Sequence, residues 1–510
     1  HAKAWRVFGA YMQQDRSPQS ALAPTAVVDR LLSGPIAQLD ADTGARTDRR
    51  VSAGGRIGAQ HGAHALESGV DLAYAASTAD PGFSGSILEQ VDGTAARTWT
   101  FAAPAMTSHR ASTTIAAFGS DRITLTERAT LDVAVRIEHL GASADGAARG
   151  ISWWSVLPHA FFRSTLSEAH HIDWFVGGGI SAYQLPLDTL AWGDPAAPSI
   201  GVSAASGSFL YNVGPGGSGR IDPNLKRPYS NDLTFGVQAR PTDTIAIELA
   251  GLTRWDRQLL GVVNVSPNAP RYTIVDVDDP GLDLPNPADD QVLHVFNFVP
   301  PGATPYSFDN VLTNAADATA RRLGAKLSVE YTSRRLYVLF GAAAYEAEGR
   351  ASSRGFQSSE NDPGLVGEDP LFPNATLFDS GRLFGDRAFA GKVAATYRFP
   401  DDWSLGAIAR YHDGQPFSRL VIVPNLTQGA DYVRAFASGG SRFTFTATLD
   451  VRLQKVMTIS GYRVAGFVDG YNLTNRSDEV EERAVTGAAF RTPTAFQPPR
   501  TVRFGARLEF

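Results

Sequence analysis

The sequence predicts an all-β protein, a transmembrane antiparallel β-barrel, and three observations lead to this fold class. Apolar residues recur at every second position along many segments, and the gaps between these segments alternate between long and short. The sequence contains no run of eighteen apolar residues, so it offers no membrane-spanning helix. A hydrophobic content of 43% agrees with a barrel, in which only every second side chain faces lipid.

The C-terminal residues carry this alternation most clearly. The apolar positions are Val502, Phe504, Ala506, Leu508 and Phe510, and between them lie Arg503, Gly505, Arg507 and Glu509. A strand with this pattern has one apolar face and one charged face, as a strand between lipid and a wet interior requires. We therefore expect residues 502–510 to form the strand that closes the barrel.

The same alternation predicts about sixteen strands. They lie near residues 3–14, 49–60, 65–77, 110–119, 128–139, 152–163, 170–177, 231–240, 243–254, 319–331, 335–346, 388–399, 402–412, 441–454, 462–471 and 502–510. Their lengths suit tilted membrane strands of about 9–11 residues. Three further extended segments, at 262–265, 272–277 and 292–299, either prolong a hairpin outside the membrane or add two strands to the count.

The gaps between the predicted strands indicate the orientation of the barrel. Long loops are expected near residues 15–48, 78–109, 178–230, 255–318, 347–387, 413–440 and 472–501. Outer-membrane barrels place long loops outside the cell and short turns in the periplasm. Because the last gap is long, we expect Phe510 to end in the periplasm. Residues 1–510 are then barrel throughout, and no plug domain is recognisable.

Aromatic residues at the strand ends fit the two interfaces of a membrane. With this orientation Tyr331, Phe399 and Trp403 fall near the inner interface, and Tyr411 and Tyr471 near the outer one. Aromatic side chains are enriched at both interfaces of membrane proteins, so these five residues are the predicted interfacial girdle.

Composition excludes several classes of function. The sequence contains no cysteine, so disulfide frameworks, zinc–thiolate clusters and thiol chemistry are excluded. A net charge of -6 gives no reason to expect nucleic acid as a partner. We find no convincing catalytic motif, and we expect no enzyme activity, no catalytic residue and no cofactor.

Two glycine-rich segments, a histidine pair and two tryptophans have simple structural explanations. Residues 177–179 and 214–217 lack the Lys-Ser/Thr ending of a phosphate-binding loop, and we place both in an outer loop. His170-His171 has no second ligand pair at metal spacing. Trp153 and Trp154 are expected to anchor the barrel at the outer interface.

The predicted loop at 255–318 contains an acidic stretch that is a weak candidate for a calcium site. Asp276, Asp278, Asp279 and Asp283 belong to it, and Ca²⁺ prefers carboxylate oxygens. The spacing does not match an EF-hand and prolines interrupt it, so a solvated acidic loop is the alternative. If the stretch binds Ca²⁺, changing its aspartates to asparagine lowers the affinity for Ca²⁺.

Several segments together resemble the C-terminal part of a TonB-dependent outer-membrane receptor of the Oar-like kind. The ending TPTAFQPPRTVRFGARLEF (492–510) is similar to the last loop and strand of that family, and VDGYNLTNR (468–476) to its penultimate strand. The other matching segments are IDPNLKRPYSNDLTFGVQ (221–238), DRITLTERATLDVAVRIEH (121–139) and YHDGQPFSRL (411–420). The resemblance spans about 120 to 510 in family order.

This resemblance implies a receptor and transporter for ligand uptake across the outer membrane of a Gram-negative bacterium. Val502, Phe504, Leu508 and Phe510 then form the signal that the barrel insertion machinery reads. Such receptors have about 22 strands around a plug, so we expect this chain to be part of a larger barrel. TonB contacts these receptors through the plug region, which is not recognisable here. A second chain completing the barrel is an alternative, and outer-membrane lipid and lipopolysaccharide are expected partners.

Two other functions fit a barrel of this size. Sixteen strands suit a passive porin, although the loops are longer than a diffusion pore needs. The long loops also suit a structural or adhesive barrel that forms one component of a surface complex. Conductance in a lipid bilayer distinguishes the receptor from the passive porin, because a plugged receptor is nearly closed.

Overall fold

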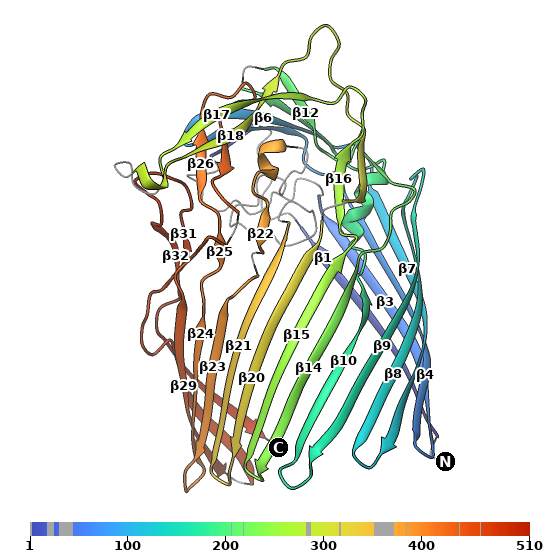
Figure 1. The fold of residues 1–510 in the computed structure, drawn as a ribbon, viewed down its shortest axis with the longest axis vertical. Coiled ribbons are helices and arrows are strands. Elements are labelled where there is room, and N and C mark those ends of the chain that lie inside the picture. Colours follow the sequence, from blue (N-terminus) through green and yellow to red (C-terminus); the bar gives the residue numbers. More distant parts are fainter. Residues whose placement is uncertain are drawn as a thin grey trace.

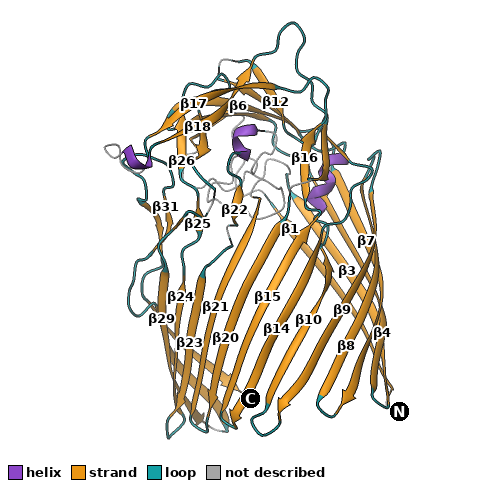
Figure 2. Ribbon diagram, in the orientation of Figure 1, coloured by secondary structure: helices purple, strands orange, loops and turns teal. Residues whose placement is uncertain are grey.

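The computed structural model describes residues 3–17, 25–29, 44–205, 207–217, 219–281, 287–315, 318–350, 372–383, 385–437, 439–459 and 461–509. A tall curved wall of strands carries a folded cap at one end (Figure 1). Strands dominate the chain, and the described helices are short (Figure 2). Among the described residues, no helix is both long and apolar enough to cross a bilayer.

Sixteen long strands form the wall and follow one another in chain order. They are β1 (Lys3–Arg16), β3 (Arg46–His61), β4 (His64–Ala79), β7 (Ser108–Thr126), β8 (Ala129–Ala144), β9 (Ile151–Ser167), β10 (Ile172–Ala182), β14 (Tyr229–Thr242), β15 (Ile245–Arg257), β20 (Ala320–Thr332), β21 (Leu336–Arg350), β23 (Phe389–Arg398), β24 (Trp403–His412), β29 (Thr446–Ile459), β30 (Tyr462–Tyr471) and β33 (Thr501–Glu509). Each wall strand is hydrogen-bonded antiparallel to the next.

The predicted fold class is therefore confirmed. The short strand β22 (Ser380–Arg382) pairs with the end of β21 and brings the described wall sheet to 17 strands. The three additional segments predicted around 262–299 lie in the cap, as parts of β16 (Leu260–Asn264), β17 (Arg271–Asp279) and β18 (Gln291–Val299). They add no strand to the wall, because their backbone groups pair with other cap strands.

Short turns join the wall strands at the end opposite the cap (Figure 1). Two of these turns are residues 62–63 and 127–128, and residues 399–402 form another. Asp401 and Asp402 both have positive φ, 57° and 59°. Tight hairpins favour this left-handed conformation because its twist matches that of the strands, and Asp tolerates it. The two labelled chain ends lie at this same end of the wall (Figure 1).

The register of the wall places apolar and charged side chains on opposite faces. Val468 lies directly opposite Phe504, and both are exposed on the outer face. One position further along, Asp469 lies opposite Arg503 on the inner face. Side chains alternate between the two faces of a strand, so a one-residue shift would exchange the faces. The wall is thus apolar outside and polar inside.

Strands β1 and β33 are the two edges of the described sheet. In the part of the chain that the structure describes, β1 pairs only with β3 and β33 only with β30. Each edge presents a row of backbone N–H and C=O groups. Such groups cannot be left unpaired toward lipid, because an unsatisfied N–H or C=O group in an apolar medium costs on the order of several kcal/mol.

The cap is built from small sheets. The largest contains β2 (Thr25–Asp29), β5 (Gly85–Val91), β6 (Thr94–Ala102), β11 (Ser199–Ala204) and β12 (Phe209–Asn212). The remaining described cap elements are β13 (Gly219–Ile221), β19 (Asn310–Asn314), β25 (Pro416–Phe417), β26 (Leu420–Val423), β27 (Asp431–Arg434), β28 (Ser441–Arg442), β31 (Glu479–Glu482), β32 (Pro493–Phe496), and the 3-10 helices η1 (Leu187–Gly193), η2 (Pro287–Asp289) and η3 (Pro373–Thr376).

Three local expectations are wrong. The glycine run 177–179 lies within β10 rather than in a loop. A Cβ on Gly177 would lie 2.4 Å from the Phe161 ring, which packs over this glycine. A larger residue would therefore clash with Phe161. The connection 145–150 at the cap end is short, so long and short gaps do not alternate strictly. Trp153 is buried and donates to the Leu225 carbonyl at 2.7 Å, whereas Trp154 is exposed.

The two edges can be tested with disulfides, because the chain has no cysteine of its own. We expect Val468→Cys/Phe504→Cys to form a disulfide, since these positions face each other on β30 and β33. We expect Val7→Cys/Phe504→Cys to form none, since no pairing joins the described residues of β1 and β33. Non-reducing gel electrophoresis measures both. Efficient crosslinking of β1 to β33 would mean that the sheet closes on itself.

Candidate functional site: the folded cap over the barrel mouth

The cap has its own apolar core and is not a set of separate loops. Three outer connections contribute to one cluster, which includes Ile87, Trp99, Phe101, Ile200, Val202, Leu210, Tyr211 and Phe298. A second cluster joins β18 to the β26–β27 hairpin through Leu293, Val295, Val421, Val423 and Val433. Full burial of one such side chain stabilises by about 1.5–3 kcal/mol. The described loops therefore hold one another across the top of the wall, where β6, β12, β17 and β18 arch over it (Figure 1).

A buried charge cluster lies at the centre of the cap. The Arg97 guanidinium donates to both carboxylate oxygens of Glu89, at 2.8 and 3.1 Å, and to Asp431 at 3.2 Å. Trp99 Nε1 also donates to Glu89, at 2.7 Å. The side chains of Arg97 and Glu89 are 3% and 0% exposed, so water does not screen this pair. Strands β5 and β6 are thereby fixed to β27, which lies 334 residues further along the chain.

A second buried ion pair joins β17 to the segment before β26. Arg419 donates to both oxygens of Asp279, at 2.6 and 2.7 Å, and to the Thr486 hydroxyl at 2.7 Å. Gln291 donates to Asp279 at 2.8 Å and to the Ala435 carbonyl at 2.9 Å. Burial opposes ionisation of Asp279, but the hydrogen bonds from Arg419 and Gln291 outweigh it and hold the pKa of this carboxyl below its usual range.

Buried amide side chains complete the backbone hydrogen bonds of β18. Asn374 accepts from the Phe296 N–H at 2.9 Å and donates to the Phe296 carbonyl at 3.0 Å. Gln428 accepts from the Phe298 N–H at 2.8 Å and donates to the same Phe296 carbonyl at 2.8 Å. At these positions the two amides take the place of a neighbouring strand, so the N–H and C=O of Phe296 and the N–H of Phe298 are satisfied.

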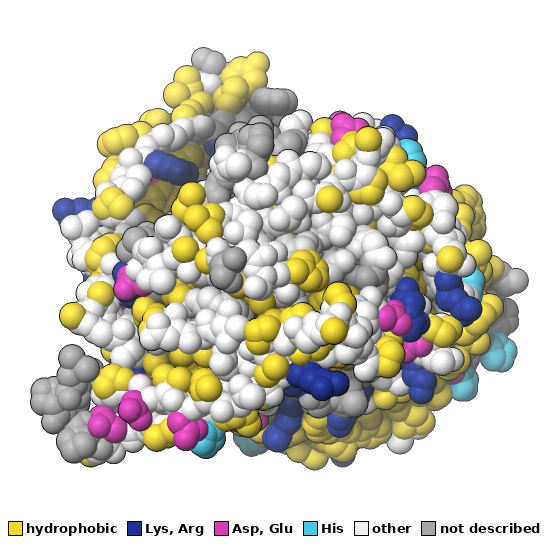
Figure 3. Space-filling model, turned by 90° about the horizontal axis from the view of Figure 1, so that it is seen from above, with side chains coloured by type: hydrophobic (Ala, Val, Ile, Leu, Met, Phe, Trp, Pro, Cys, Tyr) yellow, Lys and Arg dark blue, Asp and Glu magenta, His cyan; other side chains and the backbone are white. Residues whose placement is uncertain are grey.

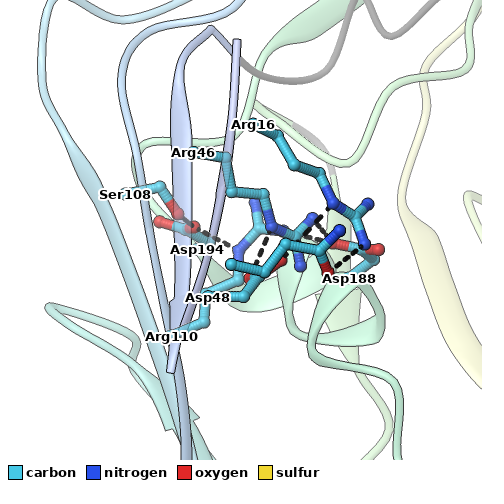
Figure 4. Close-up of polar contacts among 8 residues, drawn as sticks. Arg16, Arg46, Asp48, Ser108, Arg110, Asp188 and Asp194 are labelled. Atoms are coloured by element: carbon cyan, nitrogen blue, oxygen red, sulfur yellow. Dashed lines mark hydrogen bonds and ion pairs between the residues drawn. The ribbon is translucent and has the colours of Figure 1, made fainter. Parts of the chain in front are cut away.

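An ion-pair cluster fixes the loop containing η1 to the upper ends of β3 and β7 (Figure 4). Arg46 contacts Asp48 at 2.7 Å and Asp188 at 2.6 Å. Arg110 contacts Asp194 at 2.8 Å and Asp188 at 3.7 Å. Asp188 thus bridges two arginines that come from different wall strands. Because Asp194 is buried and also accepts from Ser108, the loop is held against the wall at two points.

The inner face of the wall carries a second set of ion pairs. Arg136 contacts Asp71 at 2.5 Å and Glu138 at 2.9 Å, and Glu138 also contacts Arg227 of the cap at 2.6 Å. Lys326 contacts Glu248 at 2.6 Å. Unlike the outer face, this surface suits water and polar solutes, which is the usual character of the interior of an outer-membrane barrel.

A hollow of about 500 Å³ lies against the inner wall between β8 and β20. Phe161, Leu252 and the glycines of residues 177–179 line it, together with Asp232 and Arg254. It is apolar at its base with charged groups at its side, so it fits a group that is partly apolar and partly polar.

The predicted girdle residues lie at the ends of their strands. Tyr331, Phe399 and Trp403 lie beside the short turns 333–335 and 399–402. Tyr411 and Tyr471 lie at the cap ends of β24 and β30. Tyr471, however, is on the inner face, where its hydroxyl donates to Asp469 at 3.3 Å and Arg503 lies over its ring, so it does not face lipid as a girdle residue would. All five side chains are exposed, and so are Val502, Phe504 and Leu508 of β33. Phe510 lies outside the described residues.

The acidic stretch is divided between the two faces of β17. Asp276 and Asp278 are exposed, and Asp276 pairs with His294 at 2.7 Å. Asp279 points to the opposite, buried face toward Arg419. Asp283 lies outside the described residues. Within the described part of the chain, no three His, Asp or Glu side chains form a group that could hold a metal ion.

Sequence reasoning missed the charge pairs of the cap. Their partners lie 140 and 334 residues apart, so no local motif announces them. One signal was available: Glu89 lies between Ile87 and Val91, at a position where the alternation of β5 calls for an apolar residue. Arg97 occupies the equivalent position on β6 and is the register partner of Glu89.

Comparison with known proteins identifies the fold. Neither the protein-family models nor the curated proteins give a match. The outer membrane transporter YddB from Escherichia coli matches with a TM-score of 0.58 and 11% identity, over 99% of this chain and 60% of that one. The copper transporter OprC matches with a TM-score of 0.51 and 14% identity, over 100% and 62%. The ferric-catecholate import receptor Fiu from K12 E. coli matches with a TM-score of 0.51 and 13% identity, over 91% and 55%.

These matches establish a class of fold. The wall has the same β-barrel fold as these outer-membrane transporters and this import receptor. The chain spans about three fifths of the length of the structures it matches.

Removing Arg419 tests the second ion pair. We expect Arg419→Ala to destabilise the cap by about 3–5 kcal/mol, because it leaves the buried Asp279 carboxylate without a charged partner. Hydrogen exchange of residues 271–279 and 420–434 measures the loss of protection. Arg271→Ala, at an exposed position of the same hairpin, is the matched control and is expected to have little effect. Equal protection in both variants would contradict the prediction.

The same carboxyl predicts how the cap responds to acid. The folded pKa of Asp279 is depressed, so its contribution is fully present above its usual pKa of about 4 and is lost as pH falls below that value. Glu482 acts in the same direction, since Arg491 and the Thr444 N–H outweigh its burial and lower its pKa. We expect cap protection to fall as the pH drops below about 4. Protection that rises in this range would overturn the assignment.

Proposed function

We propose that this chain is the barrel portion of a TonB-dependent receptor that takes up a ligand across the outer membrane of a Gram-negative bacterium. The observation that carries the proposal is the folded cap, which is fixed over a polar lumen by buried ion pairs. A receptor needs a surface that selects a ligand at the mouth of the barrel and a wide lumen behind that surface. The fold of the matching transporters and receptors supports the same conclusion.

The exposed outer face supports a location in the membrane. Large apolar side chains are exposed along the wall strands, including Trp5, Val70, Phe235, Leu249 and Phe504. In water such a surface would cause association, whereas in lipid it needs no partner. The cap then faces the outside of the cell, and the short turns and the end of β33 face the periplasm. Tyr331, Phe399 and Trp403 form the inner girdle, and Tyr411 belongs to the outer one.

The unpaired edges support a larger barrel. We infer that further strands pair with β1 and β33, in a barrel of about 22 strands of the Oar-like kind. A plug within the lumen, belonging to the same protein or to a second chain, would provide the contact with TonB. The exposed residues Val502, Phe504 and Leu508, with Phe510 at the end, would be the signal for the insertion machinery.

A passive porin is less consistent with these features. A diffusion pore works best with an open mouth, whereas here three outer connections share one buried core across the top of the wall. The long outer connections also suit an adhesive barrel. A ligand-selecting cap with a polar lumen behind it favours uptake over both alternatives.

Bilayer conductance tests the cap as a barrier. We expect the native protein to conduct poorly in a planar bilayer, and Arg97→Ala to raise the conductance, because it leaves Glu89 buried without its partner and loosens the cap. Asp276→Asn, which changes an exposed charge of the cap, is the control. A large steady conductance of the native protein would favour the porin.

Capture of TonB tests energy coupling. The periplasmic domain of TonB, immobilised on a resin, is expected to retain the protein isolated from its native outer membrane, and to release it when soluble TonB domain is added. No retention of a correctly folded sample would argue against a TonB-dependent receptor.

A further inference from the structure

The outer edge of β17 is a row of backbone groups that faces away from its hairpin partner β18. In an antiparallel pair, opposite residues alternate between pairs that exchange hydrogen bonds and pairs whose backbone groups point outward. The N–H and C=O of Phe296 in β18 bond to the Asn374 amide, so they point away from β17. Ile274 is the register partner of Phe296. The N–H and C=O of Ile274 therefore point away from β18 as well.

The same alternation applies to the following residues of β17. Asp276 and Asp278 lie two and four positions beyond Ile274, so their backbone groups share its outward edge. Val275 and Val277 lie between them and bond to β18. Within the part of the chain that the structure describes, the backbone groups of Ile274, Asp276 and Asp278 make no hydrogen bond to any other element. Three N–H and three C=O groups are thus available along one edge.

This edge lacks most of the features that close an exposed edge in natural proteins. Such edges are usually short, contain a proline or a bulge, or carry charged side chains, especially lysine. β17 has nine residues, its register with β18 has no shift, and its sequence RYTIVDVDD contains neither proline nor lysine. β6, another cap strand of nine residues, is paired on both sides, with β5 and β11. Among the described cap residues, β17 is therefore a long strand with one side open.

The charged side chains at the outward positions of this edge are carboxylates. Asp276 and Asp278 are exposed, and Asp276 faces His294 of β18 at 2.7 Å. Seen from above, Asp and Glu side chains gather with a His at the lower left margin of the cap (Figure 3), and the hairpin ends on the left in Figure 1. Like charges on paired strands are destabilising, so a second copy of this chain is disfavoured and a basic strand is favoured.

The two faces of β17 specify the order of side chains in a strand that pairs with it. On one face Val275 and Val277 pack against the apolar cluster that joins β18 to the β26–β27 hairpin. On the other face Ile274, Asp276 and Asp278 are exposed. Side chains that share a face are neighbours across paired strands. The partner therefore needs an apolar residue at every second position, with basic residues between them.

We propose that the outer edge of β17 binds an extended segment of another protein in which basic and apolar residues alternate. The segment adds a strand to the hairpin. Its backbone pairs with that of Ile274, Asp276 and Asp278, and its basic side chains lie beside the two carboxylates. Strand addition of this kind gives affinity through the backbone and specificity through alternate side chains. The binding requires only the folded cap, so it goes beyond the proposed uptake function and is tested separately from it.

Fluorescence anisotropy of a labelled peptide, titrated with detergent-purified protein, tests the pattern and the charge. The probe alternates Lys and Val over eight residues, and the comparison peptide has four Lys followed by four Val. We expect the alternating peptide to bind about tenfold more tightly, and Asp276→Asn/Asp278→Asn to remove about that much affinity. Glu127→Gln/Asp243→Asn makes the same change of charge in exposed turns opposite the cap and is expected to leave binding unchanged.

Hydrogen exchange at single-residue resolution tests the backbone pairing in the native protein. The bound alternating peptide is expected to slow exchange of the Ile274, Asp276 and Asp278 amides. The Val275 and Val277 amides are expected to show no change, because they already bond to β18. A side-chain interaction without strand addition would not give this alternate pattern. The same slowing at all five amides, or at none of them, would overturn the proposal.

A proline substitution tests the edge from the side of the protein. Ile274→Pro removes one outward N–H, which an edge strand tolerates, and is expected to lower the affinity for the alternating peptide several-fold. Ile274→Ala keeps this N–H and is the control. Equal affinity of the two variants, or equal affinity of the native protein for the two peptides, would contradict strand addition at β17. The exchange pattern of the native protein decides the question if Ile274→Pro does not fold.

Discussion

The hydrogen-bonding demand of the backbone is the constraint on which the rest of this structure depends. A wall placed in hydrocarbon can leave no N–H or C=O group unpaired, and strands meet that demand only through their neighbours. From β1 to β33, each wall strand here pairs with the next wall strand in chain order. The same pairing fixes the register, and the register fixes which side chains face outward. Among the described residues, the outer edges of β1 and β33 are the points where this demand is not met.

The cap follows a different physical rule from the wall. The wall buries little apolar surface of its own, because its apolar side faces outward. The cap instead has buried apolar clusters and buried ion pairs, as a water-soluble domain does. Burying a charge is tolerated only with a partner, so Arg97 with Glu89 and Arg419 with Asp279 commit distant loops to one arrangement. The proposed role in selecting a ligand needs such definition, since a ligand surface built from independent loops would have no fixed shape.

The proposed function uses three surfaces of different chemistry. In it, the cap and the polar lumen serve a ligand that enters from outside, and the outer face serves the membrane. The hollow in the lumen wall places small residues beside large aromatic ones. Alternation along a strand lets these surfaces coexist only one residue apart.

The sequence by itself determined the wall. A period of two is a local property, so Val502 to Leu508 and the other fifteen strands could be recognised from their own residues, and the family resemblance of the barrel with them. Only the tertiary structure decided the cap. Glu89 meets Asp431 through Arg97, and Arg419 meets Asp279, across separations that no periodicity encodes. The sequence singled out Asp279 as a calcium candidate, but it did not show which way the Asp279 side chain faces. Whether a carboxylate faces solvent or an arginine depends on the strand that carries it and on the loop that packs against it.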